Sequence, residues 1–445
     1  MHSSTGTAAS ELTADDRPAA LLPRLELFRL SLYWLGLTSI FAGLSFILAG
    51  RLEYDGLILD KNTAGRTLFA ITISGAIIAV IVQPTVGSIS DYTVSRWGRR
   101  KPYILVGSIL DMVFLIGIAL SNDLVAIAAF VALLQFSSNM AQGPFQGYVP
   151  DLVPAPQVGF ASALVGMMQI LGNVAGFVIA GIAVANRQFA IGVIALGVLE
   201  LATMLSVVIR VREGKAPKSR EGRSWASVAA QAWGTDILRE RSFLWLVGSR
   251  LAVLMAGGVL TNLALFYLAR TLGMSATEAG TAFIVLVGLV ALGTVIAVVP
   301  SARLSDRVGR KPVIYASCVI GAIGMAIVAT APSFPIALVG TLLFGLSAGI
   351  FLAVDWALMT DIIPKASSGR YMGISNVATA SAGVLAIAIG GSLMDAVGDA
   401  AGPRAALWLA VALFGIGALL LHPVVEGRRD GDTAGVVAVS ASPVD

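Results

Sequence analysis

The chain has 445 residues, of which 57% are hydrophobic and 13% are charged, whereas an ordinary soluble domain is about a quarter charged. So little charge cannot cover the surface of a soluble protein of this size, which excludes a soluble enzyme, a nucleic-acid-binding protein and a disordered chain as leading interpretations. The formal net charge of +4 at pH 7 comes from basic residues spread over short loops, which is typical of a membrane protein.

The predicted elements follow from the apolar runs. A membrane-spanning helix needs roughly 20 mostly apolar residues, and its backbone polar groups must bond within the helix. After a cytoplasmic N-terminal tail at 1–29, six runs form a first bundle at 30–210, near 30–50, 67–89, 102–121, 124–149, 158–185 and 188–210. A cytoplasmic central linker at 211–242 leads to a second six-helix bundle at 243–422, with runs near 243–269, 279–301, 312–331, 334–360, 368–395 and 404–422, and a disordered cytoplasmic tail follows at 423–445. The sequence therefore predicts an all-α membrane protein with twelve transmembrane helices.

Basic residues decide the predicted orientation. With the N-terminus inside, most of the 30 lysine and arginine residues fall on the cytoplasmic side, as the positive-inside rule requires. Arginine outnumbers lysine, a bias typical of GC-rich bacterial genomes. We expect a multi-pass protein of a bacterial inner (plasma) membrane with both termini in the cytoplasm.

The two halves repeat each other. The sequence GRRKP at 98–102 matches GRKP at 309–312, and DLVP at 151–154 matches DIIP at 361–364. From the shared proline onward, the paired positions keep one constant separation. Two parallel six-helix pseudo-repeats place a cleft at their interface, a geometry suited to alternating access.

Residues with catalytic or metal-binding chemistry are scarce. His2 and His422 are the two histidines, and Cys318 is the single cysteine. No nucleophile–base–acid set and no histidine metal cluster can be assembled from them. We therefore expect no enzyme activity, no cofactor and no metal site.

The loops at 91–101 and 306–311 place an acid at the end of one helix and a basic cluster at the start of the next. Such a pattern predicts a cytoplasmic charge latch whose ion pairs rearrange as the halves rock. A plain positively charged loop is the alternative interpretation. The latch residues would be Asp91, Arg96, Arg99 and Arg100 in the first loop, and Asp306, Arg307, Arg310 and Lys311 in the second.

The first loop, within 83–104, resembles the signature loop of the major facilitator superfamily. Together with 139–151 and 172–176, it is similar to the plant sucrose transporters and to their relatives among the glycoside–pentoside–hexuronide:cation symporters. The resemblance covers roughly a quarter of the chain and implies cation-coupled transport of a sugar or glycoside. The sucrose transporters have an acid where this chain has Gln135 and an arginine where it has Gln146. These two neutral amides argue against sucrose itself and against coupling through this helix.

Polar side chains lie on shared faces of three predicted helices. A face is shared by residues three or four positions apart, and amides and hydroxyls suit the hydroxyl groups of a sugar. We predict substrate-binding residues on these faces, namely Gln135, Asn139, Gln142 and Gln146, then Gln169 and Asn173, and Trp34 and Thr38. The amides have the alternative of joining helices to one another, and Trp34 that of an interfacial anchor. Gly172 and Gly176 form a GxxxG pattern, which predicts a close helix contact.

Four ionisable residues fall inside predicted spans, namely Asp111, Glu200, Arg250 and Asp355. Each costs roughly 2.5–3.5 kcal/mol on insertion scales and therefore needs a partner, a cavity or neutralisation. Asp355 and Arg250 lie at similar depth, so we predict that they interact and that proton binding to Asp355 releases Arg250. A static pair joining two helices is the alternative. Asp111 is a further coupling candidate, whereas Glu200 is a weaker one.

These features predict a secondary active transporter that moves a sugar or glycoside together with a cation, most simply a proton. The alternative is a proton-antiport exporter of an amphipathic drug or metabolite. A non-transporting receptor or scaffold on a transporter fold is a third interpretation, against which the two latch loops argue. The expected partners are a small solute and the lipid bilayer, with no nucleic acid, and the expected state is a monomer.

Overall fold

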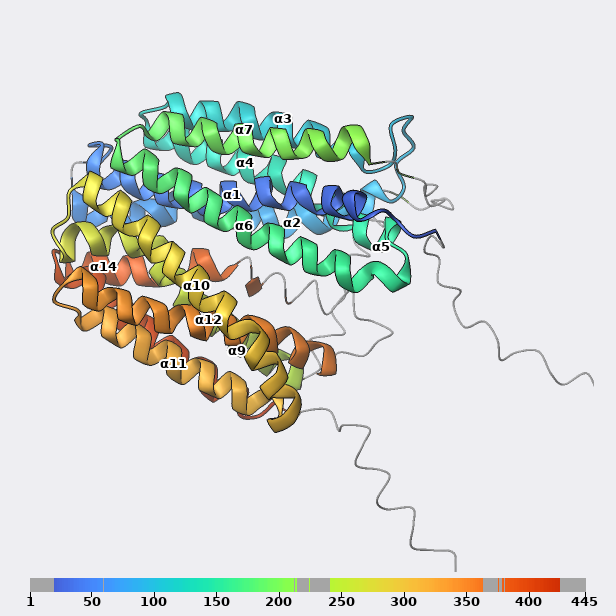
Figure 1. The fold of residues 1–445 in the computed structure, drawn as a ribbon. Helices are drawn as coiled ribbons and strands as arrows, with labels where there is room; N and C mark the ends of the chain where they lie inside the picture. The colour runs from blue at the N-terminus through green and yellow to red at the C-terminus, as the bar shows by residue number, and fades with distance from the viewer. Residues whose placement is uncertain are drawn as a thin grey trace, which may run out of the picture. The chain divides into compact units, whose positions relative to one another are not determined.

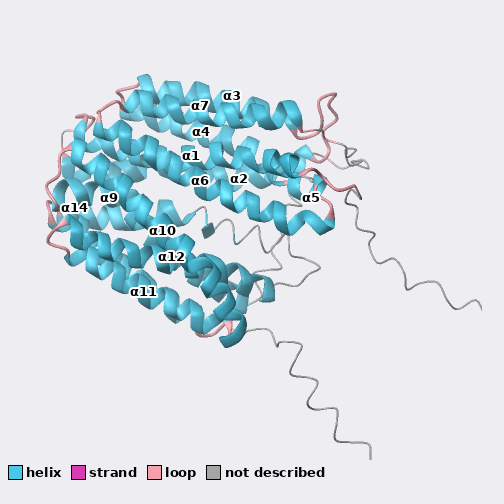
Figure 2. Cartoon of the chain, viewed as in Figure 1, coloured by secondary structure: helices cyan, strands magenta, loops and turns pink. Residues whose placement is uncertain are grey.

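A computed structural model describes residues 20–58, 60–211, 213, 224, 241–362, 375, 378–379 and 381–424. Within these ranges the chain is helical and contains no strand (Figure 2). The first helices are α1 (Arg24–Tyr54), η1 (Lys61–Thr63), α2 (Ala64–Ser90), α3 (Lys101–Leu120), α4 (Leu124–Gln146), α5 (Tyr148–Leu152), η2 (Ala155–Gln157), α6 (Val158–Ala185) and α7 (Phe189–Arg210). The later ones are α9 (Arg241–Phe266), η4 (Tyr267–Thr271), α10 (Ala276–Val308), α11 (Arg310–Thr330), α12 (Phe334–Ile362), η6 (Ile387–Gly391), α14 (Ser392–Val397) and α15 (Ala401–Leu421).

Eleven helices among the described residues are long and apolar enough to cross a membrane. They correspond to eleven of the twelve predicted spans. The twelfth, predicted near 368–395, is represented by a shorter apolar helix at Ser381–Val397, because most of 368–380 lies outside the described residues. The predicted central linker and C-terminal tail also fall largely outside them. The all-α membrane fold predicted from the sequence is therefore confirmed.

The described helices form two compact units. The first unit comprises 1–233 together with 262–288 and 387–403, and the second comprises 234–261, 289–386 and 404–445. The first unit thus includes the end of α9, the start of α10, and the segment from η6 through α14.

Small residues bring the helices of the first unit together. α1 packs against α6 and α7, and α3 packs against α4 and α7 (Figure 1). A Cβ atom added at Gly172 of α6 would overlap Thr38 of α1, and one at Gly176 would overlap the carbonyl oxygen of Ser39. The close contact predicted from the GxxxG pattern is confirmed, and it joins α6 to α1.

At one end of the first unit, charged groups join segments that are far apart in the sequence. Asp395 of α14 accepts hydrogen bonds from the backbone nitrogens of Gly65, at 3.1 Å, and Arg66, at 2.7 Å. It therefore caps the first turn of α2. Glu53 at the end of α1 pairs with Arg270 of η4 at 2.8 Å and with Lys61 at 3.0 Å.

In the second unit, α11 packs on α12. A Cβ atom added at Gly324 of α11 would lie 2.7 Å from the carbonyl oxygen of Gly340, and one at Gly340 would lie 2.5 Å from that of Gly324. These two glycines face each other, so the two helices approach at backbone distance. The close approach joins α11 to α12, the helix that carries Asp355.

Candidate functional site

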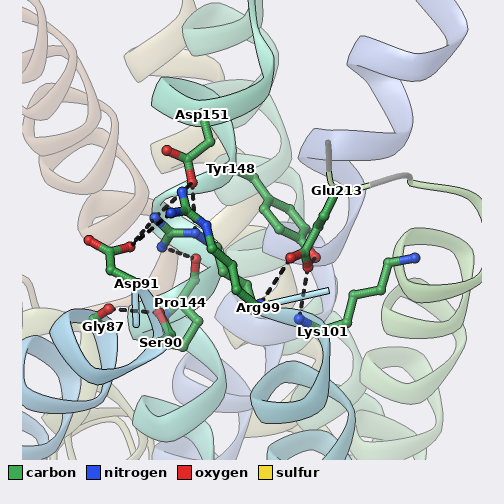
Figure 3. Close-up of polar contacts among 10 residues, drawn as sticks. Gly87, Ser90, Asp91, Arg99, Lys101, Pro144, Tyr148, Asp151 and Glu213 are labelled. Atoms are coloured by element: carbon green, nitrogen blue, oxygen red, sulfur yellow. Dashed lines mark hydrogen bonds and ion pairs between the residues drawn. The ribbon is translucent and has the colours of Figure 1, made fainter. Parts of the chain in front are cut away.

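The loop between α2 and α3 holds a buried cluster of charges (Figure 3). Asp91 follows the last residue of α2, and the loop turns at Gly98, whose φ of 115° suits a residue without a Cβ atom. This turn places Arg99 and Arg100 immediately before α3, which begins at Lys101. Both arginine side chains are almost fully buried, 4% and 8% exposed respectively. Buried guanidinium groups need close acceptors.

Two carboxylates supply these acceptors. Arg100 donates from Nη2 to Asp91 Oδ1 and from Nε to Asp151 Oδ2, both at 2.8 Å. Its Nη1 donates to the carbonyl oxygen of Pro144 at 2.8 Å. Arg99 donates to Asp151 as well, and its Nη1 lies 4.0 Å from Asp91 Oδ1. The two arginines therefore join the end of α2 to α5 and to the end of α4.

Glu213, just beyond α7, extends the cluster. Its carboxylate accepts hydrogen bonds from the backbone nitrogens of Arg100 at 3.0 Å and Lys101 at 2.8 Å, and from the Tyr148 hydroxyl at 2.7 Å. A carboxylate at this position satisfies free N–H groups at the start of α3 and lies favourably in the field of the helix. In Figure 3, Glu213 lies on the side of the cluster away from Asp91.

Two members of this cluster, Asp151 and Glu213, are not predicted from the sequence as latch residues. In the sequence, Asp151 stands out as a landmark of the repeat, and its recurrence at 361 is a signal that could have indicated it. Glu213 stands as an acid among basic residues after α7, a weak signal that does not indicate its partner. Arg96, by contrast, was predicted in the latch, but the structure places it on the surface, 5.8 Å from the centre of the Trp97 ring.

The corresponding loop in the second unit is more open. Arg310 donates to Asp306 Oδ1 at 2.5 Å and to Ser305 Oγ at 2.6 Å. The Asp306 side chain is 64% exposed. Lys311 donates to the carbonyl oxygens of His422 and Val424, at 2.9 and 2.8 Å. The predicted Asp306–Arg310 contact is therefore present. Arg307 is exposed. The residue at 361, which corresponds to Asp151 in the repeat, has a side chain outside the described part of the structure.

Arg250 of α9 and Asp355 of α12 form an ion pair inside the second unit. Their side chains are 5% and 2% exposed. Arg250 Nε also donates to Thr379 Oγ1 at 3.2 Å, and its guanidinium lies 5.0 Å from the centre of the Trp356 ring. The other carboxylate oxygen, Asp355 Oδ1, is buried without a hydrogen-bond partner among the described residues. The structure thus brings together the two residues that the sequence analysis paired.

The predicted substrate-binding residues lie in the first unit in varied surroundings. Trp34 is 8% exposed and its ring centroid lies 5.7 Å from that of Phe145, so it is a core residue and not an interfacial anchor. Thr38 donates to the carbonyl oxygens of Trp34 at 2.8 Å and Gln169 at 3.2 Å, which places these three residues together.

The amides of α4 are half-buried or buried along one side. Asn139 is 3% exposed and donates to the side-chain oxygen of Gln135 at 3.1 Å. Gln142 and Gln146 are half-buried, and Asn173 of α6 is exposed. A substrate-binding role for these residues stays a prediction. Asp111 lies elsewhere, on α3, where it accepts a hydrogen bond of 2.8 Å from Ser138 Oγ.

Comparisons with known proteins decide the family. A family model described as MFS/sugar transport protein matches residues 62–422, which is most of the chain. The chain belongs to the MFS/sugar transport protein family. The superfamily resemblance predicted from the first loop is therefore confirmed. Members of this family and the structural neighbours are transporters, so the expectation that the chain is not an enzyme is confirmed as well.

Individual relatives of this sugar-transport family member match over limited regions or at low identity. Sucrose transport protein SUT1 of Oryza sativa subsp. japonica is 32% identical over 127 residues, which cover 24% of this chain and 24% of that protein. The chain thus matches only about a quarter of the length of this curated relative.

Solved structures support the fold over nearly the whole chain. The crystal structure of a D-xylose-proton symporter has a TM-score of 0.68 at 18% identity and covers 90% of this chain and 97% of its own. The crystal structure of the nucleoside transporter NupG has a TM-score of 0.62 at 16% identity, with coverages of 89% and 97%. At such identities the likeness shows the major facilitator fold alone.

Proposed function

We propose that this protein is a secondary active transporter that moves a sugar or glycoside together with a proton by alternating access. The family supports transport of a sugar-like solute. The observation that carries the coupling proposal is the buried Arg250–Asp355 pair, in which Asp355 Oδ1 has no partner among the described residues. A carboxyl group with one oxygen paired to arginine and one oxygen free is able to accept a proton at the free oxygen.

Protonation changes what Arg250 binds. While Asp355 is ionised, its charge compensates the guanidinium in a medium where an unpaired charge costs several kcal/mol. When Oδ1 takes up a proton, the pair loses most of its Coulomb attraction, and the hydrogen bond from Arg250 to Oδ2 becomes one to a neutral carboxyl group. The other partners of Arg250 among the described residues are Thr379 and the Trp356 ring. The released guanidinium then moves or binds the solute. Proton binding and helix movement are coupled in this way.

In this proposal the protein lies in a bacterial inner membrane, has both termini in the cytoplasm and acts as a monomer. The asymmetry of basic residues supports the orientation. The substrate would contact the polar faces of α1, α4 and α6. Because Gln135 and Gln146 replace charged residues of the sucrose transporters, a solute other than sucrose is favoured.

A proteoliposome assay tests the proposal. Labelled sugars and glycosides are exchanged by counterflow, and solute-driven proton movement is followed with a pH-sensitive dye. We expect Asp355→Asn to retain counterflow and to lose proton movement at least about tenfold. The matched control is Asp399→Asn, an exposed acid in a loop with a φ of 43°, which asparagine tolerates. Undiminished proton movement in Asp355→Asn contradicts the coupling role.

The neutral amides Gln135 and Gln146 favour one second candidate, proton-driven export of an amphipathic compound. The same liposomes distinguish the two functions. Exchange of labelled sugars supports the first, whereas exchange of dyes or drugs without any sugar exchange supports export.

A further inference from the structure

Two acidic side chains meet in the interior of the first unit, away from the Arg250–Asp355 pair. Asp111 of α3 and Glu200 of α7 are both fully buried. The Tyr33 hydroxyl joins Glu200 to Ser108, which lies one turn before Asp111 on α3, so the two carboxyl groups lie in the same interior region. No lysine or arginine among the described residues pairs with either acid. The charged residues of α1, α3 and α7 other than these two acids lie near the helix ends, and α4 has none.

Hydroxyl groups surround the pair. The Tyr33 hydroxyl of α1 donates to Glu200 Oε1 at 2.9 Å and lies 2.7 Å from Ser108 Oγ of α3. Ser138 Oγ of α4 donates to Asp111 Oδ2 at 2.8 Å. Ser137 of α4 donates to Asp111 Oδ1, and Thr203, one turn after Glu200 on α7, donates to backbone carbonyl oxygens. These are the further polar side chains near the pair for which the described part of the chain shows hydrogen bonds.

The donors do not suffice for two ionised carboxylates. Each hydroxyl supplies one hydrogen, and after these are placed, Glu200 Oε2 is buried without any partner among the described residues. Two adjacent negative charges without a cation are very costly in a low-dielectric interior. One additional proton removes one charge and donates a hydrogen bond from one carboxyl group to the other.

We propose that Asp111 and Glu200 form a second proton-binding site, which holds one proton between the two carboxyl groups. In the loaded state, one acid is a neutral O–H donor and the other is a carboxylate acceptor. Release sends the proton to water and leaves two carboxylates, which then repel each other. The site therefore differs from the Arg250–Asp355 pair, where a cation compensates the carboxylate.

The position of the site links it to the candidate substrate-binding faces. Tyr33 precedes Trp34 on α1, and Ser138 precedes Asn139 on α4, so the loaded pair holds these two helices against α3 and α7. Loss of the proton weakens this arrangement at both helices. This consequence for transport rests on the proposed function, whereas the presence of the proton does not.

Infrared difference spectroscopy on the purified full-length protein tests the site. The spectrum of the double variant Asp111→Asn/Glu200→Gln is subtracted from that of the unmodified protein at about pH 7. The amides have the shape of the acids and retain hydrogen bonds to the hydroxyls. We expect the difference to contain one protonated carboxyl band and one carboxylate band. Two carboxylate bands without a protonated one, or two protonated bands, overturn the proposal.

A second measurement keeps the test valid if the double variant does not fold. Folded protein that holds an extra proton loses stability as the pH rises, because the unfolded chain has already released that proton. The ratio of folded to unfolded protein falls tenfold per pH unit until the folded protein releases the proton as well. We expect the melting temperature to fall less steeply between about pH 6 and pH 9 in Glu200→Gln than in the unmodified protein. Identical pH profiles overturn the proposal. Because neither measurement uses a solute, a failed counterflow assay and a failed proton site are distinguishable.

Discussion

Asp151 and Asp306 allow a direct test of how much more a buried ion pair contributes to stability than an exposed one. Asp151 accepts hydrogen bonds from both Arg99 and Arg100, and the three side chains are 13%, 4% and 8% exposed. Asp306 contacts Arg310 in the second loop, but it is 64% exposed. Both acids are changed to asparagine, which preserves shape and removes the charge.

The expected magnitudes follow from the exposure. Removal of one partner from a buried ion pair costs about 3–5 kcal/mol, because it leaves a charge without compensation. Asp91 still pairs with Arg100 at 2.8 Å, so we expect Asp151→Asn to lose about 3 kcal/mol, the lower end of this range. An exposed pair contributes about 0–1 kcal/mol, so Asp306→Asn should lose less than about 1 kcal/mol.

Denaturant titration of the purified protein in detergent measures both free energies of unfolding. We expect Asp151→Asn to be destabilised by at least twice as much as Asp306→Asn. Added salt should weaken the Asp306 contact more, since exposed charges are screened and buried ones are not. Equal losses in the two variants, or a loss below about 1 kcal/mol in Asp151→Asn, would refute the assignment of a buried latch to the first loop.

Two further substitutions test the packing of charged groups. A Cβ atom at Gly147 would overlap the Arg100 guanidinium, so Gly147→Ala should lower the unfolding free energy by about 1–3 kcal/mol. The control is Gly159→Ala, because a Cβ atom there meets nothing within 4 Å. Equal stabilities of the two variants would contradict the overlap. Asp395→Ala removes the cap of α2 and should cost about 1 kcal/mol, whereas an unchanged free energy of unfolding would show that water replaces the cap.

The sequence predicted the elements that depend on apolar length. Eleven spans, the family and the Gly172–Gly176 contact required only hydropathy, motif and spacing. The Arg250–Asp355 contact was also predictable, because two opposite charges at one depth of a membrane protein have few other partners. A role for either residue in coupling stays a prediction.

Features set by loop conformation could not be predicted. Arg96 and Arg100 both belong to the basic cluster, and only the turn at Gly98 decides that Arg100 enters the interior while Arg96 stays outside. Glu213 reaches the start of α3 from beyond α7, a contact between segments more than a hundred residues apart. The proximity of Asp111 to Glu200 likewise depends on the packing of α3 on α7.

The contact of Glu213 has a mechanical consequence. Glu213 stands at the start of the segment that connects α7 to α9, and it binds the backbone nitrogen of Arg100, whose side chain binds Asp91 and Asp151. The main chain of Arg100 therefore binds Glu213 while its side chain binds the two carboxylates that join α2 to α5. Any shift of Glu213 relative to α3 therefore acts on the residue that holds the charge cluster together.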